Sequence, residues 1–191
     1  MAVADLEAQK RELRKRIRAD LHALPPSRRA LEEELVQASI QADPVWQDAR
    51  LVLLYKAVPP EFSVVGLTLA AWRAGKRTLF PRVAGPGQLT LHEVTSWSGL
   101  QPGSFGIPEP AAGLPPVSPK EVDLAIVPAV GWDADGHRLG RGGGFYDRLI
   151  PQLGGPAWGV GFDCQWVPKL PRAQWDAQVA KTWVSTPLGL F

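Results

Sequence analysis

The sequence predicts an α/β domain with a largely parallel sheet, and three observations support this fold class. Residues 49–55 (ARLVLLY) and 122–130 (VDLAIVPAV) are short apolar runs without alternation, a pattern typical of strands that are covered on both faces. A helical pattern at 63–76 separates the first of these strands from another strand at 77–83. This order makes a βαβ unit, which is right-handed in nearly all folds.

The composition limits the class of protein. The chain has 191 residues, of which 45% are hydrophobic and 21% charged, so one globular domain over 1–191 is expected. The net charge of +2 is too small to indicate a nucleic-acid partner. The lone Cys164 excludes a disulfide framework and a thiolate zinc site. No run approaches the roughly 18 apolar residues of a membrane-spanning helix, and the N-terminus lacks a signal pattern. We therefore expect a soluble, cytoplasmic protein.

The first quarter of the chain is predicted to be helical. Leucine and isoleucine recur at spacings of three and four over 5–24, which indicates an amphipathic helix that the following two prolines end. A second helix is expected over 27–41, with Ser27 as its N-cap. The spacing of its apolar positions, Leu31, Leu35 and Ala38, fits this helix.

The middle of the chain is less regular. Residues 88–94 alternate between polar and apolar and predict a more exposed strand. Residues 96–122, which we call the excursion, are rich in Pro and Gly and are typical either of a domain linker or of an ordered loop. We favour an ordered loop because Trp97, Phe105 and Ile107 are apolar anchors that a flexible linker would not carry.

The segment 136–144 (GHRLGRGGG) holds five glycines in nine positions, and it follows the most apolar strand. A short helix at 145–150 comes next, and strands at 157–162 and 180–186 complete the sheet. Each glycine costs conformational entropy to order, so such a density indicates a ligand. Unpaired amides at a helix start beyond a parallel strand favour an anion. The spacing fits neither the Walker nor the Rossmann fingerprint.

Charged residues around these glycines extend the prediction. Arg138 and Arg141 can fork onto phosphate oxygens, and Asp147 lies close enough in the next helix to hold Mg²⁺. A solvated glycine turn with two surface arginines is the alternative. The segment 133–136 (DADG) is similar to the start of a calcium loop but lacks the later ligands, so a plain turn is expected.

The segment RLGRGGGFYDR, residues 138–148, resembles the signature of the 5-formyltetrahydrofolate cyclo-ligase family. The strand end before it, VPAVGWDADG, is also similar to the family pattern. Further matches follow the family order over nearly the whole chain: KRELRKR near the N-terminus, Glu61 after the first strand, FPRV, GSFGIPEP and LPRAQWD. The resemblance implies a three-layer, largely parallel α/β fold of the Rossmann-like, NagB/RpiA/CoA-transferase-like type.

The resemblance also implies a reaction. Members of the family close 5-formyltetrahydrofolate to 5,10-methenyltetrahydrofolate while ATP is split to ADP and phosphate with Mg²⁺. In that reaction the formyl oxygen accepts the phosphoryl group, N10 closes the ring, and phosphate departs. Such chemistry depends on positioning and charge neutralisation more than on a protein nucleophile. A monomer that binds this small molecule, and neither nucleic acid nor membrane, is expected.

Residue roles follow from the same resemblance. Arg141 and Tyr146 are implied as catalytic residues, and Asp147 and Asp176 as metal ligands. The implied ATP contacts are Lys10, Arg11, Glu12, Leu13, Arg14, Arg138, Leu139, Gly140, Arg141, Gly142, Gly143, Gly144, Phe145 and Tyr146. The implied substrate contacts are Lys56, Glu61, Arg141, Gly142, Gly143, Gly144 and Phe145.

Departures and alternatives complete the prediction. The chain has FSVV after Glu61, where the family usually has an acid or Thr pair, and Ala180 where a second Asp is common. Trp97, Phe105 and Trp132 are either stacking partners for a ring or core residues. The alternative functions are an ATP-dependent ligase acting on another substrate, a non-catalytic folate-binding regulator, and an RNA-binding protein that uses the basic first helix.

Overall fold

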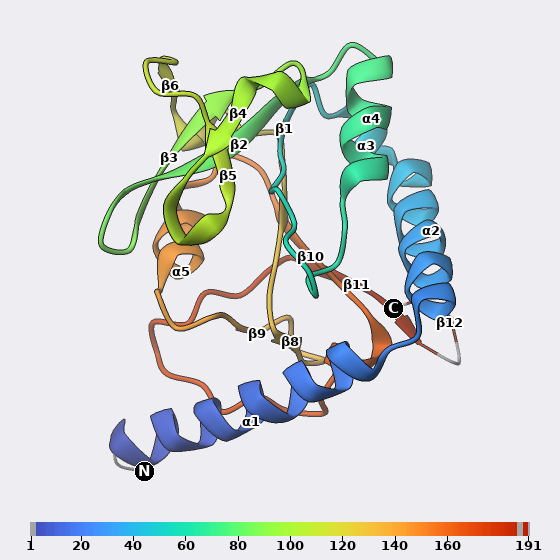
Figure 1. The fold of residues 1–191 in the computed structure, drawn as a ribbon, viewed down its shortest axis with the longest axis vertical. Helices are drawn as coiled ribbons and strands as arrows, with labels where there is room; N and C mark the ends of the chain where they lie inside the picture. Colours follow the sequence, from blue (N-terminus) through green and yellow to red (C-terminus); the bar gives the residue numbers. More distant parts are fainter. Residues whose placement is uncertain (1–2, 187–188, 191) are drawn as a thin grey trace.

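The computed structural model describes residues 3–186 and 189–190, and one large sheet runs through its centre (Figure 1). The strand order is β12-β11-β10-β7-β1-β2-β3-β6. Neighbouring strands are parallel from β11 to β2, and β12, β3 and β6 join antiparallel at the two edges. These strands are β1 Leu51–Leu53, β2 Arg77–Gly85, β3 Gln88–Glu93, β6 Pro116–Val117, β7 Leu124–Val127, β10 Ala157–Gly161, β11 Lys181–Thr186 and β12 Gly189–Leu190. The predicted fold class is confirmed.

Helices cover both faces of this sheet. In Figure 1, α2, α3 and α4 stand on one side, α5 lies on the other, and α1 crosses below. Two further strand pairs, β4–β5 and β8–β9, lie outside the sheet. The helices are α1 Val3–Ala23, α2 Pro26–Ala42, α3 Pro44–Asp48, α4 Val65–Arg73 and α5 Phe145–Leu149, and the extra strands are β4 Leu100–Pro102, β5 Pro108–Pro110, β8 Gly131–Trp132 and β9 Arg138–Leu139. Short 3₁₀ turns are η1 Trp97–Gly99, η2 Ser104–Gly106, η3 Pro119–Glu121, η4 Ile150–Gln152 and η5 Asp163–Gln165.

Strand β7 shows why the apolar runs lack alternation. Its four residues are all buried, but they face two different cores. Leu124 and Ile126 pack with the α1, α2 and α4 side chains, and Ala125 and Val127 pack with α5 and β11 on the other face. A central parallel strand needs apolar residues at every position because both of its faces are covered.

The second predicted helix is confirmed as α2, but the apolar residues whose spacing predicted it do not form its buried face. Leu31 and Leu35 are 55% and 48% exposed, and Ala38 is exposed as well. The buried residues of the helix are Glu32, Val36, Gln37 and Ile40. The buried Gln37 is stabilised because its Oε1 accepts a hydrogen bond from a backbone N–H of α4 at 3.0 Å. The helix also begins at Pro26 after Pro25, so Ser27 lies inside it and is not its N-cap.

The excursion is ordered, as predicted. It forms the β4–β5 pair, and Arg82 of β2 donates a hydrogen bond to the Pro110 carbonyl at 2.7 Å. Trp97 is a true anchor, because its ring packs against Trp72 with centroids 4.9 Å apart. Phe105 is not an anchor: it is 78% exposed and has a left-handed φ of 57° in a tight turn.

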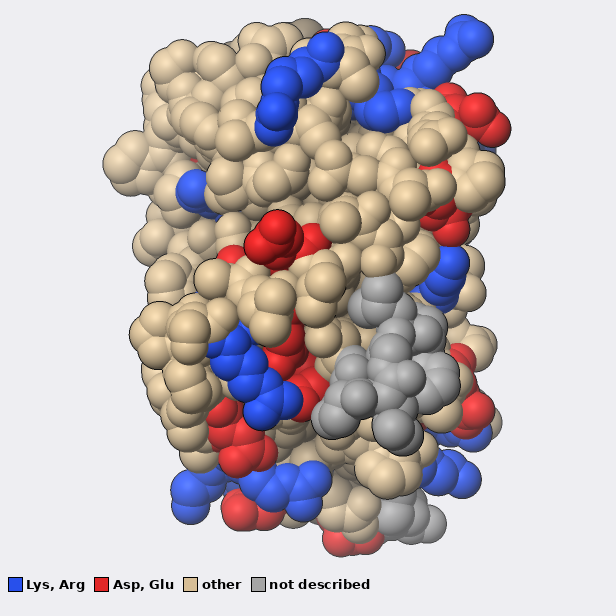
Figure 2. All heavy atoms as spheres, turned by 90° about the vertical axis from the view of Figure 1, so that its right-hand side faces the viewer, with Lys and Arg blue, Asp and Glu red and all other residues tan. Residues whose placement is uncertain are grey.

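The charge on one face of the surface and the length of the helices can be compared with what the composition predicted. On the face shown in Figure 2, Lys and Arg side chains lie among Asp and Glu side chains of opposite sign. No helix in the described part of the chain is both long enough and apolar enough to cross a membrane.

Candidate functional site

The glycine loop, residues 140–144, borders a cavity of about 360 Å³. The cavity lies where β1 and β7 end, because segment 55–61 follows β1 and residues 128–129 follow β7. This is the edge of a parallel sheet where ligands bind. The residues that line the cavity include Tyr55, Lys56, Glu61, Phe80, Pro81, Val83, Phe105, Ile107, Glu109, Pro128, Ala129, Arg138, Arg141, Phe145 and Tyr146.

An ion pair between Glu61 and Arg141 joins two walls of this cavity. Nη2 of Arg141 lies 2.7 Å from Oε1 of Glu61, and Oε2 of Glu61 accepts a hydrogen bond from the Val58 N–H at 3.0 Å. Burial raises the pKa of Glu61, and the Val58 amide and the Arg141 guanidinium oppose that rise. The sequence places these two residues 80 positions apart, and the fold brings them together.

The buried Tyr55 and the half-buried Tyr146 also line the cavity. The Tyr55 hydroxyl donates a hydrogen bond to the Phe62 carbonyl at 2.6 Å. Burial, followed by the charge of Glu61, raises the pKa of Tyr146 far above its usual value. Tyr146 is therefore a neutral phenol at physiological pH. The guanidinium of Arg138 lies over its ring, 5.5 Å from the centroid.

The carbonyl groups of the glycine loop are held by arginines from two helices. Nε of Arg14 in α1 donates to the Gly140 carbonyl at 2.8 Å. Nη1 of Arg148 in α5 donates to the carbonyls of Gly143 and Gly144 at 3.3 and 3.1 Å. Within the described residues, the N–H groups of the loop donate no hydrogen bond to the protein. The loop thus has bound carbonyls and free amides, an arrangement suited to an anion.

A group of paired charges adjoins the loop. Lys10 Nζ lies 2.5 Å from Asp176 Oδ2, and Arg138 Nη2 lies 2.9 Å from Asp147 Oδ1. Asp147 also accepts a hydrogen bond from the Ala177 N–H at 3.2 Å, which connects the two pairs. We call Lys10, Arg14, Arg138, Asp147 and Asp176 the charged cluster. Of its members, only Arg138 also lines the cavity.

Four further residues predicted for the site, Arg11, Glu12, Leu13 and Lys56, differ in whether their side chains reach it. Arg11 and Glu12 have exposed side chains, and Leu13 packs against the core. Lys10, which pairs with Asp176, and Arg14, which donates to the Gly140 carbonyl, are therefore the α1 residues that belong to the charged cluster. Lys56 does line the cavity, and its Nζ lies 4.6 Å from the centroid of the Trp97 ring.

Sequence reasoning missed two titratable residues of the cavity and left the roles of Trp97, Phe105 and Trp132 open. Tyr55 and Glu109 line the cavity but were not predicted. Glu109 is 7% exposed, and its Oε1 accepts a hydrogen bond from the Ser104 N–H at 3.2 Å. An acid inside the apolar IPEP segment was the signal available for it. Trp132 is completely buried and belongs to the core, whereas Phe105 lines the cavity.

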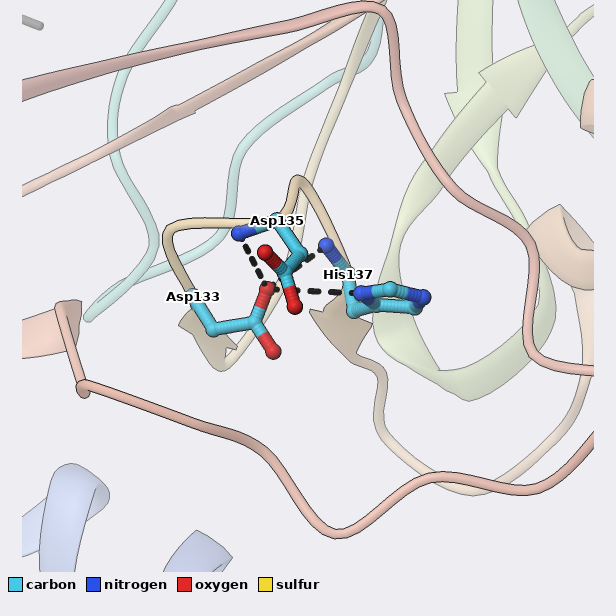
Figure 3. A group of neighbouring side chains, drawn as sticks. All are labelled: Asp133, Asp135 and His137. Atoms are coloured by element: carbon cyan, nitrogen blue, oxygen red, sulfur yellow. Dashed lines mark hydrogen bonds and ion pairs between the residues drawn. The ribbon is translucent and has the colours of Figure 1, made fainter.

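The segment 133–137 between β8 and β9 brings two aspartates and a histidine together (Figure 3). Oδ1 of Asp133 accepts hydrogen bonds from the N–H groups of Asp135 and His137 at 3.1 and 2.9 Å. Oδ2 of the same residue accepts one from the Leu170 N–H at 3.1 Å. The carboxylate of Asp133 therefore closes the turn, as expected from the sequence.

Comparisons with known proteins identify the family of this chain. Residues 6–186 match the 5-formyltetrahydrofolate cyclo-ligase family. A 5-formyltetrahydrofolate cyclo-ligase of Escherichia coli is 32% identical over 172 residues, which cover 84% of this chain and 91% of the relative. One from Haemophilus influenzae is 27% identical over 181 residues, which cover 85% of this chain and 92% of the relative. The solution structure of Aquifex aeolicus 5,10-methenyltetrahydrofolate synthetase superposes with a TM-score of 0.82 at 32% identity, covering 92% of this chain and 89% of that one. The chain belongs to the 5-formyltetrahydrofolate cyclo-ligase family.

Proposed function

We propose that this protein converts 5-formyltetrahydrofolate to 5,10-methenyltetrahydrofolate with ATP and Mg²⁺. One observation carries the proposal beyond family membership. The glycine loop borders the cavity that contains Glu61 and Arg141, and it is also bonded to the charged cluster through Arg14. A phosphoryl donor and a folate bound to one loop would have their reacting atoms next to each other.

The charged cluster and the loop fit a polyphosphate. Nε of Arg138 is buried and has no hydrogen-bond partner among the described residues, although buried donors are normally paired. Gly142 and Gly144 have φ values of 103° and 65°, which allow the loop amides to turn towards one side. These donors supply the positive field that a triphosphate requires, and the carboxylates of Asp147 and Asp176 are oxygen ligands of the kind Mg²⁺ prefers.

Each residue has a distinct role in the proposal. When bound, ATP and Mg²⁺ supply the phosphoryl group that makes the inert formyl oxygen a leaving group. Lys10 and Arg138 exchange their carboxylate partners for phosphate oxygens. Asp147 and Asp176 are the carboxylates that would hold the metal. Arg141 extends from the loop into the cavity and neutralises charge on the transferred phosphoryl group.

The cavity provides the folate end of the site. Two oxygens of Glu61 can accept a pair of N–H donors from the pterin ring. The neutral phenol of Tyr146 can donate a hydrogen bond to the formyl group while Arg141 faces the phosphate. The apolar walls keep water from the activated oxygen. Residues 1–191 act as one domain in this proposal, because both cores flank a single sheet.

The experiment is a direct assay of the purified protein. With 5-formyltetrahydrofolate and Mg·ATP, we expect the absorbance band of the methenyl product to rise, with one ADP formed per product. Arg141→Ala should abolish turnover and leave the thermal unfolding curve unchanged, because the Arg141 side chain is 46% exposed. Folate binding without turnover by the wild type would identify a regulator instead. Full activity of the variant would refute the role of Arg141.

A further inference from the structure

We propose that Arg29 is a positioning residue that fixes Glu61 by tying its loop to the C-terminal end of α1. The inference rests on the proposed function because it assigns Glu61 to the folate cavity. Arg29 itself belongs to α2 and does not line that cavity. It acts through the backbone of the 57–62 loop, which carries Glu61 into the wall.

The guanidinium of Arg29 donates two hydrogen bonds in different directions. Nη1 donates to the carbonyl of Pro60 at 3.0 Å, one residue before Glu61. Nη2 donates to the carbonyl of Leu21 in the last turns of α1 at 2.7 Å. Hydrogen bonds from a charged donor are stronger than neutral ones. One rigid fork therefore joins helix α1 to the loop that presents Glu61.

A third contact fixes the plane of this fork. The guanidinium carbon of Arg29 lies 4.4 Å from the ring centroid of Phe162, which is completely buried. Phe162 in turn packs against Phe62, with the two centroids 4.9 Å apart. Phe62 follows Glu61 directly, so both sequence neighbours of Glu61 contact Arg29 or its stacking partner. A lysine could not stack on the ring and donate along two fixed directions.

The sequence of the loop explains why an outside donor is needed. Pro59 and Pro60 have no N–H group, so the loop cannot be tied by its own amides at these positions. Its internal turn runs between Val58 and Glu61, where the Glu61 N–H donates to the Val58 carbonyl at 2.9 Å. This turn shapes the loop but does not attach it to the rest of the fold.

A second tie from α2 secures the end of the same loop. Oε1 of Glu33 accepts a hydrogen bond from the Ser63 N–H at 3.0 Å. Glu33 lies one helical turn after Arg29, so one face of α2 holds the loop on both sides of Glu61. A cavity of about 440 Å³ beside this face includes Arg29, Glu33, Pro60 and Glu61 in its lining. Without the arginine, the loop would have room to shift towards that space.

Arg28 provides a matched control on the same helix. Its side chain is 50% exposed, and its Nε donates to Glu32 at 2.8 Å. It also pairs with Asp163, but it makes no hydrogen bond or ion pair with the 57–62 loop. Arg28→Met and Arg29→Met therefore remove the same charge from neighbouring positions, and only the second cuts the tie to Glu61.

The test compares these variants with the wild type in three measurements. These are KM and kcat for 5-formyltetrahydrofolate at saturating Mg·ATP, the Kd of an ATP analogue by calorimetry, and hydrogen exchange of the backbone amides of 57–63. For Arg29→Met we expect KM to rise roughly tenfold with a smaller change in kcat, because misplacing a binding group by about 1 Å is costly. The Kd of the nucleotide should not change. The amides of Val58, Glu61 and Ser63 should exchange faster, and Arg28→Met should match the wild type.

Specific results would overturn the inference. An unchanged KM and unchanged exchange in Arg29→Met would do so, and so would an equal rise of KM in Arg28→Met. If Arg29→Met fails to fold, Arg29→Lys replaces it, and its KM should still rise because the fork is lost. Absence of turnover in the wild type would refute the proposed function, whereas the exchange measurement would still decide whether Arg29 holds the loop.

Discussion

At the scale of single residues, the site depends on charges that are paired with each other. Glu61 is paired with Arg141, Lys10 with Asp176, and Arg138 with Asp147. The sequence indicated many of these residues, since arginines beside glycines and an acid after a strand are chemically conspicuous. It could not show their pairing, because the partners lie 9 to 166 positions apart and only the fold brings them into contact.

Glu61 should give substrate binding a dependence on pH. In the proposed function its carboxylate accepts the donors of the substrate in the charged form, and burial raises the pKa of Glu61 above the usual value for glutamate. As pH falls through that raised pKa, the carboxylate gains a proton, so kcat/KM should decline at a higher pH than an ordinary glutamate would give. Glu61→Gln should lower kcat/KM and flatten this acid limb. An acid limb that persists in the variant would assign the titration to another group.

Asp176 should couple metal binding to nucleotide binding. In Asp176→Asn, Lys10 loses its carboxylate partner and becomes free for phosphate, so metal-free ATP should bind roughly tenfold more tightly, or about 1.4 kcal/mol. In the proposed function Asp176 is an oxygen ligand of the metal, so the gain in affinity that Mg²⁺ gives should shrink in this variant. Calorimetry with and without Mg²⁺ measures both effects. Glu93→Gln breaks the remote exposed pair with Arg77 and should change neither value.

At the scale of elements, periodicity predicted helices and strands better than it predicted their orientation. The long helices and the five parallel strands appear near their expected positions, because their apolar patterns are strong. The inward face of α2 was missed because it carries Glu32 and Gln37, which are buried and hydrogen-bonded. Leu31 and Leu35 lie on the exposed face of the helix. Apolar spacing cannot reveal a polar residue whose partners lie on other elements.

The glycine loop is an element whose backbone shape should matter more than its side chains. Gly144 begins α5 with a left-handed φ of 65°, and a Cβ there would lie 2.7 Å from Arg148 Nη1. Gly144→Ala should therefore lower the free energy of unfolding by about 1–2 kcal/mol and also lower activity strongly. Chemical denaturation and the product assay measure the two effects.

Gly113→Ala is the matched control for this substitution. Gly113 also has a left-handed φ, of 91°, but it is exposed, and no atom lies within 4 Å of the position that a Cβ would take. It should lose similar stability and keep full activity. Equal losses of activity in the two variants would show that general destabilisation, and not the loop, limits catalysis.

At the scale of the whole molecule, the glycine loop connects the cavity with the charged cluster. The cavity includes segments that follow β1 and β7 together with residues of β2 and the excursion. The charged cluster comes from α1, β9, α5 and the chain before β11. The sequence and its family resemblance predicted the sheet and the family, and their prediction of ATP and Mg²⁺ as ligands stays a prediction. They did not reveal how α2 supports the Glu61 loop, since that support is made by side-chain bonds to carbonyl groups, which leave no pattern in a sequence.

The transfer of an oxygen atom tests the central claim most directly. If the glycine loop brings the phosphoryl group to the formyl oxygen, that oxygen leaves the folate as part of phosphate. With ¹⁸O in the formyl group of the substrate, mass spectrometry of the released phosphate should find one ¹⁸O atom per molecule of methenyl product. Phosphate without the label, in the presence of full product formation, would contradict the account.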